Sequence, residues 1–173
     1  EFSDPKLPQS LRDILNNEEE RKKIIIYINP PYAEATSSKS INSKESRHKP
    51  GVSSSKIKEK YQKELNQGAK EVAVLFLFRI YKEISNSIIA NFSTPKFLTG
   101  VHYREFLTKF TPKLLSMFIV PGNTFDNVKG KFPIGFFIWD SKIKENFNKV
   151  TAEVYSKEDI LCGHKTFLKS PSY

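Results

Sequence analysis

Residues 24–32 have the sequence IIIYINPPY, in which five apolar residues precede Asn, two prolines and Tyr. A continuous run of β-branched and aromatic residues predicts a strand buried on both faces, as in the middle of a parallel sheet. Proline cannot donate a hydrogen bond to a neighbouring strand, so the strand must end before Pro30. We therefore expect a central strand at residues 24–28 that leads directly into the tetrapeptide Asn-Pro-Pro-Tyr.

The rest of the chain alternates between predicted helices and strands. Apolar residues at helical spacing predict helices at 57–85 and 103–115, and Pro112 should kink or tighten the last turn of the second helix. Compact apolar runs predict strands at 87–92, 117–120 and 134–139. This order predicts an α/β fold with a mostly parallel sheet. The last two strands should be antiparallel, because no crossover helix separates them. Ligand sites in such sheets lie at the carboxyl ends of the strands, where residues 29–32 are placed.

Charge and composition limit the possible partners. The chain of 173 residues carries 28 Lys and Arg against 19 Asp and Glu, and its net charge of +9 favours a polyanionic partner. One cysteine and three histidines exclude an intrachain disulfide and argue against a metal site, so we assign no metal. No apolar run approaches the roughly 18 residues that a membrane helix needs. We expect a cytoplasmic protein without a membrane partner.

The tetrapeptide resembles the catalytic motif of the amino-methyltransferases, above all the DNA N6-adenine methyltransferases, which have Asp, Asn or Ser before Pro-Pro and an aromatic residue. The resemblance implies that Asn29, Pro30, Pro31 and Tyr32 are catalytic, and that Asn29 also lies beside the cofactor S-adenosylmethionine. The Asn29 amide oxygen and the Pro30 carbonyl would accept hydrogen bonds from the target amine and direct its lone pair at the methyl donor. Tyr32 would stack on a flipped base.

Weaker similarity covers residues 24–140. Residues 129–140 are similar to the segment that closes the target-base pocket in adenine methyltransferases of restriction-modification systems, and this makes Phe132 a second candidate for stacking on the base. A core Phe at the start of a strand is an equal alternative. The resemblance implies a partial Rossmann-like methyltransferase sheet, with double-stranded DNA as the partner.

One feature of the family has no counterpart here. Its members bind S-adenosylmethionine with a glycine-rich turn that precedes the motif strand, whereas this sequence has no Gly-x-Gly and only residues 1–23 come before that strand. We expect a lead-in segment at 1–23, the C-terminal half of a catalytic domain at 24–140, and the start of a strand-rich segment at 141–173. The fragment alone should be inactive without the missing N-terminal half, or a specificity domain or subunit. The strand at 24–28 would become a sheet edge and favour self-association.

Residues 35–55 are rich in Ser and Lys and predict a mobile loop after the motif. Four lysines in or next to this loop are candidates for contacts with the DNA backbone, although a solvated basic face is an equal alternative: Lys39, Lys44, Lys49 and Lys56. Other functions also remain open. The same motif serves methyltransferases of ribosomal RNA and of protein glutamine, and the chain could be a non-catalytic module that binds DNA or protein.

Overall fold

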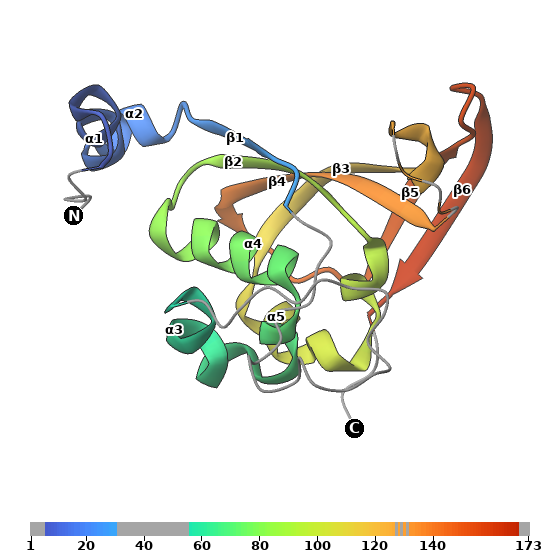
Figure 1. Ribbon diagram of the computed structural model, residues 1–173, viewed down its shortest axis with the longest axis horizontal. Coiled ribbons are helices and arrows are strands. Elements are labelled where there is room, and N and C mark those ends of the chain that lie inside the picture. The colour runs from blue at the N-terminus through green and yellow to red at the C-terminus, as the bar shows by residue number, and fades with distance from the viewer. Residues whose placement is uncertain (1–5, 31–55, 127, 129, 131, 170–173) are drawn as a thin grey trace.

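The computed structural model describes residues 6–30, 56–126, 128, 130 and 132–169. Its strands form one six-stranded sheet (Figure 1) and comprise β1 (Ile25–Ile28), β2 (Ile88–Ser93), β3 (Pro112–Pro121), β4 (Pro133–Lys144), β5 (Lys149–Tyr155) and β6 (Leu161–Leu168). Its α-helices are α1 (Gln9–Asn16), α2 (Glu18–Arg21), α3 (Lys56–Leu65), α4 (Val72–Glu83) and α5 (Arg104–Lys109). Short 3-10 helices are η2 (Asn66–Lys70), η3 (Pro95–Leu98), η4 (Val101–Tyr103) and η5 (Gly122–Thr124).

The strand order is β1-β2-β4-β3-β5-β6. Strand β1 is parallel to β2, and β3 is parallel to β5, whereas β4 runs antiparallel to both β2 and β3 and β6 runs antiparallel to β5. Four strands (β1, β2, β3 and β5) therefore point in one direction. The predicted α/β fold with a mostly parallel sheet and an antiparallel β3–β4 pair is confirmed. The insertion of β4 between β2 and β3 brings its first residues to the edge at which β1 and β2 end.

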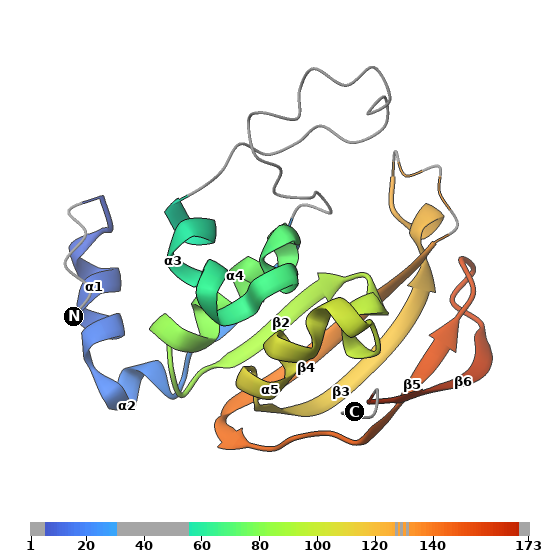
Figure 2. The same ribbon diagram turned by 90° about the horizontal axis from the view of Figure 1, so that it is seen from below.

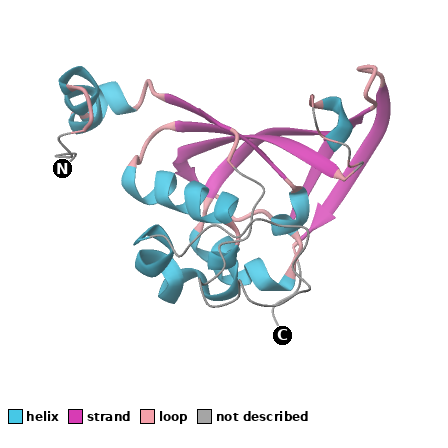
Figure 3. Ribbon diagram, viewed as in Figure 1, coloured by secondary structure: helices cyan, strands magenta, loops and turns pink. Residues whose placement is uncertain are grey.

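Helices cover one face of this sheet. Figures 1, 2 and 3 show α3, α4 and α5 together on one side, while α1 and α2 lie beyond the start of β1. The core lies under these helices, where α4 contributes Leu77 and Phe78 and the sheet contributes Ile89, Phe137 and Trp139, all at most 1% exposed. We call the side of the sheet opposite to α3, α4 and α5 the open face. Several aromatic side chains lie on this open face.

The prediction that residues 24–28 are buried on both faces is wrong. Exposure alternates along β1, and Ile25 and Tyr27 are 69% and 67% exposed. The reason is that β1 is the edge strand of the described sheet and that these two side chains point to the open face. The continuous apolar run therefore reflects β propensity here, rather than burial on both sides. The position of β1 at the end of the strand order agrees with the prediction that residues 24–28 form an edge strand.

Two helix predictions also need correction. The predicted helix at 57–85 is interrupted by η2, because Asn66 adopts a left-handed conformation with a φ of 47° and the chain then turns tightly through η2. The predicted helix at 103–115 ends at Lys109. Pro112 does not kink a last helical turn but begins β3, since the residue before a proline is pushed out of the helical region.

None of the described helices is long and apolar enough to cross a bilayer.

Candidate functional site

Asn29 and Pro30 leave the end of β1 in opposite environments. The last residue of the strand, Ile28, pairs with Asn91 of β2, so the strand remains in register up to the motif. The Asn29 side chain is exposed, whereas Pro30 is fully buried. The buried Pro30, whose ring fixes φ, anchors the backbone at this point. The side-chain amide of Asn29 is exposed at the carboxyl ends of the strands. Pro31 and Tyr32 lie outside the described residues.

The end of β2 lies beside this motif and is tightly packed. A hollow of about 10 Å³ is lined in part by Ser93, Thr94 and Tyr103. An ion pair between Lys96 Nζ and Glu71 Oε1, 2.5 Å apart, borders the same hollow. A space of this volume holds about one water molecule and no substrate.

Phe132 lies at the same end of the sheet as Asn29, which is the end where β1 and β2 finish. It immediately precedes β4, and because β4 is antiparallel to β2, its start lies where β1 and β2 end. The Phe132 side chain is 41% exposed, so it is not part of the buried core. Its carbonyl accepts a hydrogen bond from the Gly122 N–H at 2.7 Å. A Cβ at Gly122 would lie 2.8 Å from the Gly130 carbonyl oxygen, so this close approach of two backbones requires glycine.

The predicted lysines are only partly placed. Lys56 is exposed at the first residue of α3, on the side of the sheet that the helices cover. Lys39, Lys44 and Lys49 lie outside the described residues. Asn29, Pro30 and Phe132 thus lie at the same end of the sheet, where β1 and β2 finish. Lys56 lies on α3, in the helical layer that covers one face of the sheet. The roles assigned to these residues stay predictions.

An aromatic strip on the open face was not predicted from the sequence. It runs across five strands through ring contacts with centroid distances from 4.7 to 6.2 Å and consists of Tyr27, Phe92, Phe136, Phe118 and Tyr155. The signal in the sequence is the alternation of Phe118 with core residues Met117 and Ile119. The alternation alone does not show which face of the sheet the helices cover, so the sequence does not predict that these rings lie together on the other face.

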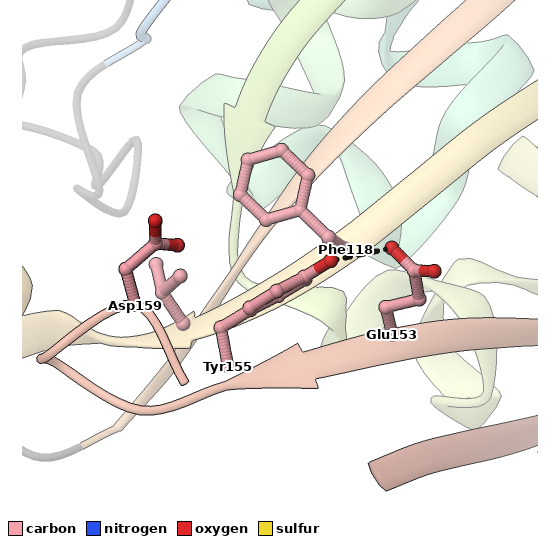
Figure 4. A pocket seen from close by; sticks show the side chains of 5 residues that line it. Phe118, Glu153, Tyr155 and Asp159 are labelled. Carbon is pink, nitrogen blue, oxygen red and sulfur yellow. Dashed lines mark hydrogen bonds between the residues drawn. The ribbon is translucent and has the colours of Figure 1, made fainter. Parts of the chain in front are cut away.

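The strip ends in a cavity that none of the described site candidates (Asn29, Pro30, Lys56 and Phe132) lines. Its volume is about 330 Å³, and it is formed by Phe118, Val120, Glu153, Tyr155 and Asp159 (Figure 4). It therefore lies at the carboxyl ends of β3 and β5, and β2 and β4 separate it from the strand that carries Asn29. Within the described residues, no cluster of three or more His, Cys, Asp or Glu side chains could hold a metal ion.

Comparison with known proteins supports the fold. No family model and no curated protein matches the chain. A solved structure of the type IIG restriction endonuclease BpuSI matches with a TM-score of 0.50 and 14% identity, over 79% of this chain and 15% of that protein. At this identity the likeness shows a shared fold, in agreement with the Rossmann-like arrangement of the sheet.

Two further matches have lower TM-scores. A modification subunit assigned to a type I restriction enzyme of Vibrio vulnificus YJ016 gives 0.47 at 11% identity, over 78% of this chain and 28% of that one. The ATP-dependent type ISP restriction-modification enzyme LlaBIII bound to DNA gives 0.45 at 12% identity, over 80% and 10%. The chain thus spans less than a third of the length of each of these proteins.

Proposed function

We propose that this chain is part of an S-adenosylmethionine-dependent DNA methyltransferase of a restriction-modification system, which methylates the exocyclic N6 of a flipped adenine. The observation that carries the proposal is the position of the Asn-Pro-Pro-Tyr motif. It begins directly at the carboxyl end of a parallel strand, with Asn29 exposed and Pro30 buried. Ligand sites of open α/β sheets lie at this end of the strands.

The proposed chemistry uses two acceptors held close together in the chain. The lone pair of an adenine amine is delocalised into the ring, so the amine is a poor nucleophile. Hydrogen bonds from its N–H groups to Asn29 Oδ1 and to the Pro30 carbonyl would draw the nitrogen towards tetrahedral geometry and orient its lone pair. The buried Pro30 ring fixes that carbonyl, so little reorganisation is needed during the reaction. The N–C bond would form as the bond from the methyl group to the sulfonium sulfur of the cofactor breaks and its electron pair stays on sulfur, and the amine would release a proton to solvent.

The cofactor would supply the electrophilic methyl group, and we propose that Asn29 lies beside it. The glycine-rich turn that the family uses to hold this cofactor has no counterpart in the sequence. We therefore propose that the other cofactor contacts come from polypeptide outside these 173 residues, and that the chain alone is inactive. A specificity domain or subunit would supply recognition of the DNA sequence.

DNA is the substrate that the surface supports best. The net charge of +9 attracts a polyanion, and the exposed ring of Phe132 at the edge shared with Asn29 offers a stacking face for an unpaired base. We propose that Tyr32 is the other stacking ring. Lys39, Lys44, Lys49 and Lys56 would contact phosphates, which makes binding dependent on salt but not on sequence.

The test is a methyl-transfer assay with radiolabelled S-adenosylmethionine and three acceptors: duplex DNA, ribosomal RNA and a release-factor peptide. The protein assayed is the complete gene product that contains these residues, with the 173-residue chain as a control. We expect label on DNA adenine from the gene product and none from the chain alone. Label on RNA or on peptide instead would replace the proposed substrate. No label on any acceptor would favour a non-catalytic binding module.

A further inference from the structure

The cavity at the end of the aromatic strip combines ring faces with carboxylates. Its walls are the rings of Phe118 and Tyr155, whose centroids are 6.1 Å apart and whose planes are nearly perpendicular at 86°. Glu153 lies beside them, and Asp159 comes from the turn between β5 and β6 (Figure 4). Its volume of about 330 Å³ is at the lower end of the range for small-ligand pockets and suits a single side chain.

The two carboxylates of the cavity have no cationic partner among the described residues. Within the described residues neither Glu153 nor Asp159 forms an ion pair, although the protein contains 28 Lys and Arg. The Tyr155 hydroxyl donates a hydrogen bond to Glu153 Oε2 at 2.9 Å, which leaves the other carboxylate oxygen for a further donor. The cavity thus carries negative charge in a protein whose net charge is positive.

The titration of Tyr155 reflects this local charge. Its hydrogen bond to Glu153, then burial, and then the charges of Glu153 and Asp159 raise the pKa of the Tyr155 hydroxyl above its ordinary value of 10.0. The ring therefore stays neutral at physiological pH, and its electron-rich face remains available to a cation.

The cavity continues into the aromatic strip. From Tyr155 and Phe118 the ring contacts pass to Phe136 at 5.3 Å, then to Phe92 at 4.7 Å and to Tyr27 at 6.2 Å. The last ring, on β1, is 67% exposed. The inner rings are half-buried and Phe125 packs against Phe92 at 5.2 Å, whereas Tyr27 is exposed. A small free cation in the cavity would leave Tyr27 uncovered. A polypeptide with one cationic side chain and apolar neighbours would cover both.

We propose that the cavity binds an arginine side chain of a polypeptide that lies along the aromatic strip on the open face. A guanidinium group is flat, weakly hydrated and rich in donors, so it can stack against one ring while it donates to a carboxylate of the cavity. A lysine has one compact, strongly hydrated charge and no flat face that could stack on a ring. The cavity lies at the same carboxyl end of the sheet as Asn29, but β2 and β4 separate β3 and β5 from the strand that leads into Asn29, and the proposal does not depend on methyl transfer.

The probe for the cation is N-acetyl-arginine amide, titrated into the 173-residue chain while the aromatic signals of Phe118 and Tyr155 are followed by NMR. N-acetyl-citrulline amide is the matched control, since it has nearly the same shape without the charge. We expect arginine amide to shift both signals and citrulline amide to bind at least about fivefold more weakly. Equal binding of the two probes, or no shift of either ring with arginine amide, would overturn the proposal.

Variants separate the cavity from the rest of the surface. Glu153→Gln combined with Asp159→Asn should weaken arginine amide binding by about fivefold or more, because both charges are lost while hydrogen-bond acceptors remain. Glu158→Gln is the control, since Glu158 is exposed in the same turn but does not line the cavity. An unchanged indole signal of the buried Trp139 checks the fold of each variant. Equal losses in the control and the double variant would contradict the assignment.

The strip is tested with a peptide that carries apolar neighbours around the arginine, acetyl-Leu-Val-Arg-Val-Leu-amide. We expect it to bind about tenfold more tightly than arginine amide, because its apolar side chains cover the rings beyond the cavity. The Phe92 and Tyr27 signals should then shift together with those of Phe118 and Tyr155. Binding no tighter than that of arginine amide, with Phe92 unaffected, would reject the polypeptide and leave only a site for a free cation.

Discussion

Asn91 and Trp139 form a buried polar contact beneath the helices, one strand away from the motif. Trp139 Nε1 donates to Asn91 Oδ1 at 3.0 Å, and both side chains are at most 1% exposed. The Asn91 Nδ2 group has no hydrogen-bond partner within the described residues. Because Asn91 pairs with Ile28, this contact lies under the residue that leads into Asn29 and Pro30. The single hydrogen bond thus helps to hold the base of the candidate site.

Trp139→Phe should destabilise the protein by about 1–3 kcal/mol, because it removes the donor and leaves the Asn91 oxygen buried without a partner. Urea denaturation measures the loss. In an Asn91→Leu background the same change should cost less, since no acceptor remains to be left unpaired. An equal cost in both backgrounds would show that the hydrogen bond contributes nothing beyond ring packing.

At the scale of elements, Glu83 links α3 to α4. It accepts hydrogen bonds from Lys60 Nζ at 2.7 Å, Arg79 Nε at 2.8 Å and the Tyr61 hydroxyl at 3.1 Å. Burial by itself raises the pKa of the Glu83 carboxyl, but the bonds from Lys60, Arg79 and Tyr61 outweigh it, so the pKa lies below its ordinary value of 4.5. The carboxylate form is therefore favoured in the folded protein.

A lowered pKa gives Glu83 a stability contribution that is present above the unfolded pKa and is lost as pH falls through the folded pKa. Glu83→Gln should cost about 1 kcal/mol at pH 7, and the difference from the wild type should shrink as the pH falls below 4.5. Chemical denaturation across this pH range provides the measurement. Glu59→Gln, an exposed position on α3, should change little throughout. A difference that stayed constant into strong acid would refute the ionic role of Glu83.

Sequence patterns predicted the existence of these elements better than their limits. Apolar runs located β1 to β4, since strands of this class are marked by composition alone. The break in the helix at 57–85 depends on a left-handed Asn66, and asparagine tolerates helical and left-handed conformations alike. The early end of α5 was signalled by Pro112, but we assigned that proline to the last helical turn instead of to the following strand.

The candidate site was predictable only in part for a similar reason. A short motif identifies Asn29 and Pro30, but their exposure and burial follow from how the strand meets the rest of the sheet. Phe132 could equally have been a core residue, and its 41% exposure follows from the tertiary structure rather than from a local pattern. The cavity joins residues from β3, β5 and a turn, and no local pattern indicates such a pairing.

Within the described residues, α3, α4 and α5 cover one face of the sheet, and β1 is the edge strand on one side. The open face carries the aromatic strip, and β1 presents the edge with Ile25 and Tyr27 exposed. An edge strand with apolar side chains and unpaired backbone groups favours pairing with another strand. We predict that the chain self-associates through the β1 edge, by two-fold symmetric antiparallel pairing with a second copy.

Ile25→Lys should weaken this self-association by about tenfold, because a charged side chain on an edge strand disfavours pairing with a second strand. Light scattering coupled to size-exclusion chromatography reports the mass. Ile160→Lys is the matched control, since Ile160 is 62% exposed in the turn between β5 and β6, far from β1 in the strand order. A wild-type chain that stays monomeric at all concentrations would contradict the prediction.

The role of Asn29 in methyl transfer is tested most directly by the N6-methyladenine content of DNA from cells that lack other adenine methylation and express the complete gene. Mass spectrometry should detect methylated adenine with the wild type, and Asn29→Ala should lower it by at least about a hundredfold. Asn29→Asp should retain activity because it keeps an oxygen acceptor, and the exposed Asn148→Ala should match the wild type. Wild-type methylation in Asn29→Ala would contradict the proposed function.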